Sequence, residues 1–138
     1  LGNDTPEASV PGEVLPAGEF YDYQAKYVDD DAKLVIPAVL DAAEVAEAQR
    51  LALETFKVLE CAGMARVDLF LEKETHKFFV NEINTVPGFT SISQYPRLWN
   101  ASGVSYPELV DRLIELAIER HRERSRLRTS YKQIPSAE

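Results

Sequence analysis

The chain has 138 residues, 45% of them hydrophobic, which is enough for one core and too few for two full domains. Its formal charge of −8 argues against a nucleic-acid-binding body, which would carry a basic face. The single cysteine, Cys61, excludes an intrachain disulfide and favours a reducing compartment, and no segment reads as a signal peptide or a membrane span.

Residues 1–33 read as a loop-like region, because prolines and glycines interrupt them repeatedly. The chain opens at Leu1 without an initiator methionine, so we expect a fragment of a longer protein. The region ends in an aromatic and polar cluster, F20-Y-D-Y-Q-A-K-Y27. Loops of this kind carry function more often than core elements do.

A first helix is expected over residues 42–60, after a short apolar run, K33-L-V-I-P-A38. Asp41 is a plausible N-cap for this helix. Apolar residues recur at three- and four-residue spacing and predict one buried face, made of Val45, Ala48, Ala52, Phe56 and Leu59. The helix is interpreted as scaffold.

Two apolar runs, A65-R-V-D-L-F-L71 and F78-F-V-N-E-I-N84, predict the arms of an antiparallel hairpin around a polar, turn-sized loop. If the loop is centred near Thr75, Asp68 faces Glu82 and Arg66 faces Asn84. Because side chains alternate faces with period two, all four then share one face. A shift of the register by an odd number of residues would separate Asp68 from Glu82.

Two carboxylates directly opposite each other repel unless a cation lies between them. Asp68, Glu82 and Asn84 supply the oxygen ligands that Mg²⁺ takes, with substrate phosphates completing its coordination. The alternative is a plain ion-pair network, since Arg66 is a neighbour of both carboxylates.

The segment T85-V-P-G-F-T-S-I-S-Q-Y-P96 has little periodicity and several hydroxyl groups. A last helix is expected over residues 106–124, starting at the box S105-Y-P-E108. Its expected inner face consists of Leu109, Leu113, Leu116 and Ala117. The Arg-rich stretch 120–138 is interpreted as a solvated helix end that complements the helix dipole, with contact to an anionic partner as the alternative.

The expected fold class is α+β: a mostly antiparallel sheet that contains the hairpin, packed against the two helices. The expected divisions are a loop region over 1–33, a subdomain over 34–124 and a polar tail over 125–138.

The hairpin strings, followed by N81-E-I-N-T-V-P-G-F-T90, Ser93 and Y95-P-R-L-W99, resemble the C-terminal signature of D-alanine–D-alanine ligases, which belong to the ATP-grasp superfamily. The cluster at 20–27 is similar to the mobile loop of the same family. The resemblance extends from about Gly12 to Leu116. It implies that this chain is the C-terminal part of an ATP-grasp fold.

The resemblance implies ATP-dependent joining of two D-alanines through an acyl phosphate, for peptidoglycan synthesis in the cytoplasm, by an enzyme that is commonly a homodimer. Asp68, Glu82 and Asn84 match ligands of two Mg²⁺ ions, for which Mn²⁺ can substitute, with Glu82 bridging them. Arg66 matches the arginine that stabilises the transferring phosphoryl group. Lys26 matches a lysine that reaches the γ-phosphate, Tyr27 a tyrosine that helps hold the loop closed, and Gly88 a glycine whose N–H serves as an oxyanion-hole donor. Ser93 and Gln94 match residues that bind the second D-alanine, and Phe20 and Phe70 match apolar contacts to the nucleotide.

The chain also departs from the family. No G-x-x-x-x-G-K-[ST] string or comparable Gly-rich phosphate loop occurs in residues 1–138, so we expect this polypeptide to be inactive alone. Two alternatives stay open: a relative that uses D-lactate or D-serine as the second substrate, and a fragment that folds or associates without catalysis.

Overall fold

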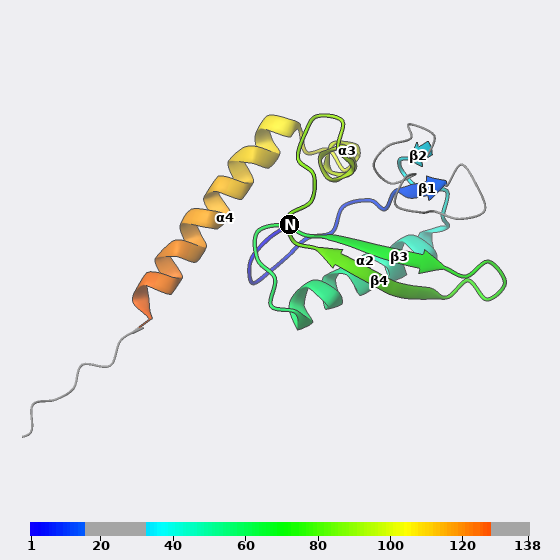
Figure 1. The fold of residues 1–138 in the computed structure, drawn as a ribbon, viewed down its shortest axis with the longest axis horizontal. Coiled ribbons are helices and arrows are strands. Elements are labelled where there is room, and N and C mark those ends of the chain that lie inside the picture. Colours follow the sequence, from blue (N-terminus) through cyan, green and yellow to red (C-terminus); the bar gives the residue numbers. More distant parts are fainter. Residues whose placement is uncertain (16–32, 128–138) are drawn as a thin grey trace, which may run out of the picture.

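The computed structural model describes residues 1–15 and 33–127 (Figure 1). The elements in chain order are β1 (Glu13–Leu15), β2 (Lys33–Val35), α2 (Ala42–Val58), β3 (Arg66–Leu71), β4 (Phe78–Asn84), α3 (Gln94–Ala101) and α4 (Tyr106–Arg126). Two antiparallel strand pairs, β1–β2 and β3–β4, combine with the helices, so the expected α+β class is confirmed. No helix within the described residues is long and apolar enough to cross a bilayer.

Helix α2 forms where the periodicity predicts it, and Asp41 is its N-cap. The Asp41 carboxylate accepts from the Glu44 N–H at 2.8 Å, and Glu44 accepts from the Asp41 N–H at 2.9 Å. The helix ends at Val58, two residues before the expected end. Leu59 is therefore the C-cap and is 55% exposed, so its assignment to the buried face is wrong.

The β3–β4 hairpin packs against α2, which lies behind it in Figure 1. At the tip of the hairpin, His76 Nδ1 lies 2.7 Å from Glu44 Oε1. The Asp41 backbone N–H and His76 hold the pKa of Glu44 below its usual value. Because α2 covers one face of the hairpin, the other face is left for function.

Three elements were not expected from the sequence: the short strands β1 and β2, the first of which lies within the region read as loop-like, and helix α3. Its first turn contains Pro96, which is tolerated there because the first N–H groups of a helix have no intrahelical partner. Tyr95 and Trp99 are buried on one side of α3, and they form the main core cluster with Leu1, Val104 and Leu109. This short helix therefore connects the loop after the hairpin to the core.

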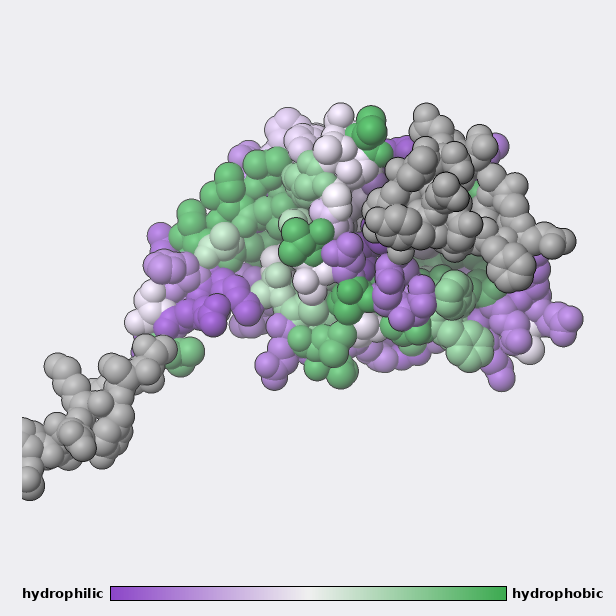
Figure 2. Space-filling view, viewed as in Figure 1, coloured by the Kyte–Doolittle hydropathy of each residue, from purple (hydrophilic) through white to green (hydrophobic). Residues whose placement is uncertain are grey.

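Helix α4 runs from Tyr106 to Arg126, and its N-cap is Ser105, whose side chain accepts from the Glu108 N–H as expected. Leu109 is fully buried, and Leu113 and Leu116 pack against the core cluster. Ala117 is exposed, contrary to expectation, because α4 extends beyond the core at this point (Figure 1). Ile114 and Ile118 lie on its exposed surface, where Figure 2 shows apolar side chains.

Asn3 joins three parts of the molecule. Its amide donates to the Leu116 carbonyl at 3.0 Å and to Glu119 at 2.7 Å, and its carbonyl oxygen accepts from the Gly63 N–H at 3.3 Å. Gly2 and Gly63 form an antiparallel bridge beside it. The start of the chain is thus fastened both to α4 and to the segment that enters β3.

Tyr95 carries a buried hydroxyl with no hydrogen-bond partner among the described residues. Burial raises the pKa of Tyr95 to about 12; the Trp99 indole opposes part of this shift without reaching hydrogen-bond geometry. An unpaired buried hydroxyl costs free energy, so Tyr95→Phe is expected to leave the unfolding free energy unchanged or raise it by about 1 kcal/mol. Denaturant unfolding measures the change.

The matched control is Tyr106→Phe, because the Tyr106 hydroxyl donates to the Phe89 carbonyl at 2.9 Å. Losing that bond should lower the unfolding free energy by about 0.5–1.5 kcal/mol. A larger loss for Tyr95→Phe than for Tyr106→Phe would show that the buried hydroxyl has a partner.

Candidate functional site

The hairpin places the four candidate residues as the sequence predicts. Asp68 pairs with Glu82 and Arg66 with Asn84, so all four share one face of the hairpin. Nearer the tip the register differs by one, with Leu69 opposite Val80. A β-bulge absorbs the difference and leaves Asn81 as the extra residue, directly before Glu82.

Arg66 is bound to both oxygens of Asp68. Its Nε lies 2.7 Å from Oδ1 and its Nη2 lies 2.8 Å from Oδ2, while Nη2 is 3.8 Å from Glu82 Oε1. The side chains are partly exposed, at 17% for Arg66, 30% for Asp68 and 45% for Glu82. The ion-pair network that the sequence left open as the alternative is therefore present.

The donor set also fits a hard cation. Two carboxylates from adjacent strands face each other at a partly exposed surface, and a hard cation takes such oxygen ligands while it keeps several waters. Asn84 Oδ1 accepts from the Val86 N–H at 3.0 Å and, as a carbonyl oxygen, keeps a second lone pair. No group of three or more His, Cys, Asp or Glu side chains gathers in the described part of the chain, so the candidate ligands here are two carboxylates and one amide oxygen.

Two aromatic residues continue the same face toward the tip. Phe70 pairs with Phe79 across the ladder, and they are 62% and 54% exposed. Phe70 is a candidate from the sequence, whereas Phe79 is not. Strict alternation along β4 without the bulge would place Phe79 on the opposite face from Glu82. The two exposed rings form an apolar surface next to the charged one that Asp68 and Glu82 make.

The loop after β4 brings Gly88 and Ser93 together. A Cβ built on Gly88 would lie 3.1 Å from Ser93 Oγ. Ser93 Oγ accepts from the Thr90 N–H at 3.0 Å and lies 2.8 Å from Thr90 Oγ1. Ser93 is also the N-cap of α3, so Gln94 is the first helical residue, and the helix N-terminus with its free N–H groups favours a carboxylate.

Phe89 anchors this loop. Its ring packs against Tyr95 and Tyr106 at centroid distances of 6.1 and 5.5 Å, and its carbonyl accepts from the Tyr106 hydroxyl. Gly88 and Ser93 flank this anchored segment. The core below α3 and α4 therefore fixes the loop at the end of the strand that carries Glu82 and Asn84.

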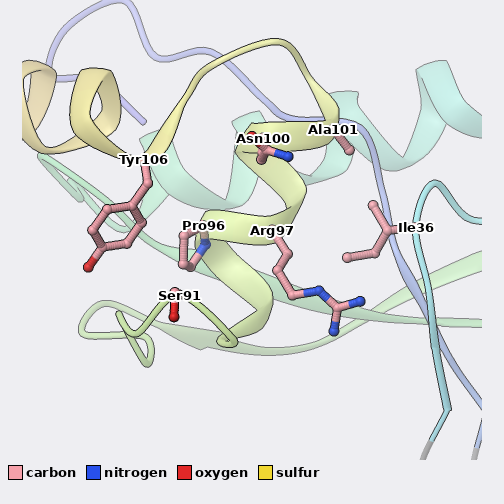
Figure 3. A pocket seen from close by; sticks show the side chains of 7 residues that line it. All are labelled: Ile36, Ser91, Pro96, Arg97, Asn100, Ala101 and Tyr106. Carbon is pink, nitrogen blue, oxygen red and sulfur yellow. The ribbon is translucent and has the colours of Figure 1, made fainter.

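A pocket of about 360 Å³ lies on the side of α3, and none of the metal candidates lines it (Figure 3). The Arg97 guanidinium extends toward Ile36, whereas the hydroxyl groups of Ser91 and Tyr106 point elsewhere. Because these polar groups diverge, the pocket does not define a binding site. The candidate site is instead the open face of the hairpin and the loop that follows it.

Three candidates, Phe20, Lys26 and Tyr27, lie outside the described residues. Their roles stay predictions. The structure brings together Arg66, Asp68, Glu82 and Asn84 on one face, and Gly88 with Ser93 in the next loop.

Comparisons with known proteins show which family this chain resembles as a whole. A family model described as D-ala D-ala ligase C-terminus matches residues 1–115. A D-alanine–D-alanine ligase of Acetivibrio thermocellus is 55% identical over 121 residues, which are 88% of this chain and 32% of the relative. The chain thus spans about a third of the length of the curated relatives that it matches.

Two solved structures are similar. The D-alanine-D-alanine ligase from Coxiella burnetii has a TM-score of 0.78 and 44% identity, over 91% of this chain and 32% of that one. The VanG D-Ala:D-Ser ligase from Enterococcus faecalis has a TM-score of 0.74 and 36% identity, over 84% of this chain and 34% of that one.

Proposed function

The chain belongs to the D-alanine–D-alanine ligase family, as its C-terminal part, and from this premise we propose that it carries the metal- and phosphate-binding portion of an ATP-dependent ligase that joins two D-alanines. In this reaction one D-alanine carboxylate attacks the γ-phosphorus of ATP and releases ADP. The amine of the second D-alanine then attacks the acyl phosphate, loses a proton and expels phosphate.

One observation supports this proposal most directly: Asp68 and Glu82 face each other beside Arg66 on an exposed sheet face. A reaction on a polyphosphate needs positive charge to stabilise the transferring group, and anionic ligands to hold the cation that supplies it. Both requirements are met by three residues within one hairpin.

Asp68, Glu82 and Asn84 would hold Mg²⁺, which when bound neutralises phosphate oxygens during transfer. Glu82 would serve as a ligand of both ions, as the family resemblance implies. Arg66 contributes a planar, permanently charged group for the developing negative charge. Phe70, together with Phe79 opposite it, would contact the nucleotide.

The next loop would hold the acceptor. The Gly88 N–H donates to the oxyanion of the tetrahedral intermediate, and the absence of a side chain there keeps that N–H accessible beside Ser93. Ser93 Oγ and the Gln94 N–H bind the carboxylate of the second D-alanine at the start of α3. Lys26, Tyr27 and Phe20 retain the roles that the family resemblance implies for the mobile loop.

We also propose that the full-length enzyme is a cytoplasmic homodimer that acts in peptidoglycan synthesis and cell-shape maintenance. A cytoplasmic location is compatible with the single cysteine.

The second candidate function is a D-serine ligase, because a D-Ala:D-Ser ligase is among the similar structures. Turnover of the full-length enzyme with D-alanine, D-serine and D-lactate as second substrate separates the alternatives. Preference for D-alanine in kcat/KM supports the main proposal, whereas preference for D-serine or D-lactate replaces it.

The isolated 138-residue chain is expected to show no D-alanine-dependent ADP release, because it has no Gly-rich loop to cradle the phosphates. The full-length protein is expected to release ADP only when D-alanine and Mg²⁺ are both present. A coupled assay measures ADP in both cases, and calorimetry tests ADP binding by the short chain. Nanomolar ADP affinity of the short chain would contradict the expectation that it lacks part of the ATP site.

A further inference from the structure

We propose that Glu44, in the first turn of α2, and His76, in the turn of the hairpin, are positioning residues for the nucleotide. Their contact holds the outer half of the hairpin, which carries the exposed pair Phe70 and Phe79. The inference rests on the proposed function and deepens it, since that function assigns the two rings to the nucleotide.

The β-bulge divides the hairpin into two halves. The inner half carries the metal candidates Asp68 and Glu82, and the outer half extends from the pair of Leu69 and Val80 to the turn at 72–77. A bulge interrupts the ladder and bends the strand that contains it. The orientation of the outer half relative to the inner half therefore depends on contacts that the outer half itself makes.

The turn of the hairpin is a small hydrogen-bonded unit. The Glu72 N–H donates to the Lys77 carbonyl at 3.0 Å, and the His76 N–H donates to the Glu72 carbonyl at 2.9 Å. Phe70 and Phe79 form the second ladder pair from this turn. A contact that fixes the turn therefore also restricts where the two rings lie.

His76 adopts a left-handed backbone conformation, with a φ of 53°. A residue with a side chain adopts this conformation at a cost, whereas glycine or asparagine adopts it more readily. The chain instead has a ring here that reaches α2, because His76 Nδ1 lies 2.7 Å from Glu44 Oε1. The ring can donate this hydrogen bond whether it is neutral or protonated. The choice of histidine therefore fits the contact with α2 better than it fits the turn.

Glu44 is a firmly held acceptor. Its Oε2 accepts from the Asp41 N–H at 2.9 Å, and its own N–H donates to Asp41 Oδ1 at 2.8 Å, so the capping box fixes its side chain. The Glu44 side chain is 16% exposed, whereas that of His76 is 68% exposed. The carboxylate therefore belongs to the body of the molecule, and the imidazole ring ties the hairpin turn to it.

The test is the affinity of the full-length protein for ADP in the presence of Mg²⁺, measured by calorimetry. His76→Asn removes the ring and supplies a residue that tolerates the left-handed conformation. This variant is expected to raise the Kd of ADP about threefold, the factor that a hydrogen bond of modest net free energy accounts for. The kcat and the KM for D-alanine should change by less than about twofold, because a positioning contact for the nucleotide affects its binding alone.

His121→Asn is the matched control for His76→Asn. His121 is the other histidine of the chain and is exposed on α4, which Figure 1 shows at the opposite end of the molecule from the hairpin turn. Its replacement should leave the Kd of ADP unchanged. An equal effect of the two substitutions would overturn the inference.

A double-mutant cycle tests whether the two residues act together. Glu44→Ala should weaken ADP binding, whereas Glu47→Ala should not, because Glu47 pairs with Arg50 at 2.7 Å along α2. In the Glu44→Ala background, His76→Asn should have no further effect. Fully additive effects would show that the residues act separately, which contradicts a shared contact.

Phe70→Ala and Phe79→Ala separate this inference from the proposed function. If either weakens ADP binding while His76→Asn does not, the nucleotide contact stands and the positioning role is wrong. If neither weakens it, the assignment of the rings to the nucleotide fails, and the positioning role fails with it.

Discussion

Replacing Glu82 with Gln in the full-length enzyme is expected to lower kcat by about 10²–10³-fold, because metal charge stabilisation is worth several kcal/mol and each 1.36 kcal/mol is a factor of ten. The substitution keeps the shape of the side chain and removes one negative charge. Glu82 faces Asp68 across the ladder, so the substitution removes one of the two proposed anionic ligands of the metal. Steady-state rates at increasing Mg²⁺ concentration measure the effect.

The dependence on Mg²⁺ distinguishes a ligand from a structural residue. A lost ligand raises the Mg²⁺ concentration needed for half-maximal rate, whereas a general loss of folded enzyme lowers the rate at every concentration. Glu74→Gln in the exposed hairpin loop is the matched control, with the same charge change in the same hairpin and no expected effect. Equal activity of Glu82→Gln and Glu74→Gln would remove Glu82 from the metal site.

The prediction that Asp68 faces Glu82 is correct, but it assumes a loop centred on Thr75, whereas the hairpin closes at Leu71–Phe78 and a bulge supplies the missing residue. The bulge at Asn81 could not be predicted, since neither glycine nor proline marks it. A hairpin closed at Leu71–Phe78 without a bulge would place Asp68 opposite Asn81. The register at the site therefore depends on one extra residue that sequence alternation does not show.

Helix α3 could not be predicted because its eight residues contain Pro96 and span barely two turns, too short for a clear 3.6-residue period. The signals that existed were local: Ser93 as a cap and a proline in the first turn. The exposure of Ala117 has a different cause. Periodicity indicates which face of α4 is apolar, but the point at which the core ends depends on tertiary packing.

Replacing Leu109 with Ala is expected to lower the unfolding free energy of the chain by about 2–5 kcal/mol, because a buried leucine leaves a cavity that collapses only in part. Leu109 has no exposed surface and lies in the cluster that contains Tyr95 and Trp99 of α3. For a chain of this size the melting temperature should fall by roughly 10–20 °C. Thermal and denaturant unfolding measure both quantities.

Two control variants are expected to lose less stability than Leu109→Ala. Leu127→Ala, at a residue 66% exposed just beyond the same helix, should change stability by less than about 0.5 kcal/mol. Leu109→Met should cost less than about 1.5 kcal/mol, because the volume is nearly conserved. A loss for Leu109→Ala no larger than for Leu127→Ala would show that α4 does not depend on this contact.

Leu109→Ala should also affect the two parts of the site differently. The hairpin rests on α2, whereas α3 rests on α4 through the Leu109 cluster. Below its melting temperature, the full-length variant should therefore bind Mn²⁺ nearly as the parent does, while KM for the second D-alanine rises because the start of α3 is less firmly held. A matching loss of Mn²⁺ affinity would mean that the hairpin face and the α3 loop depend on a single core.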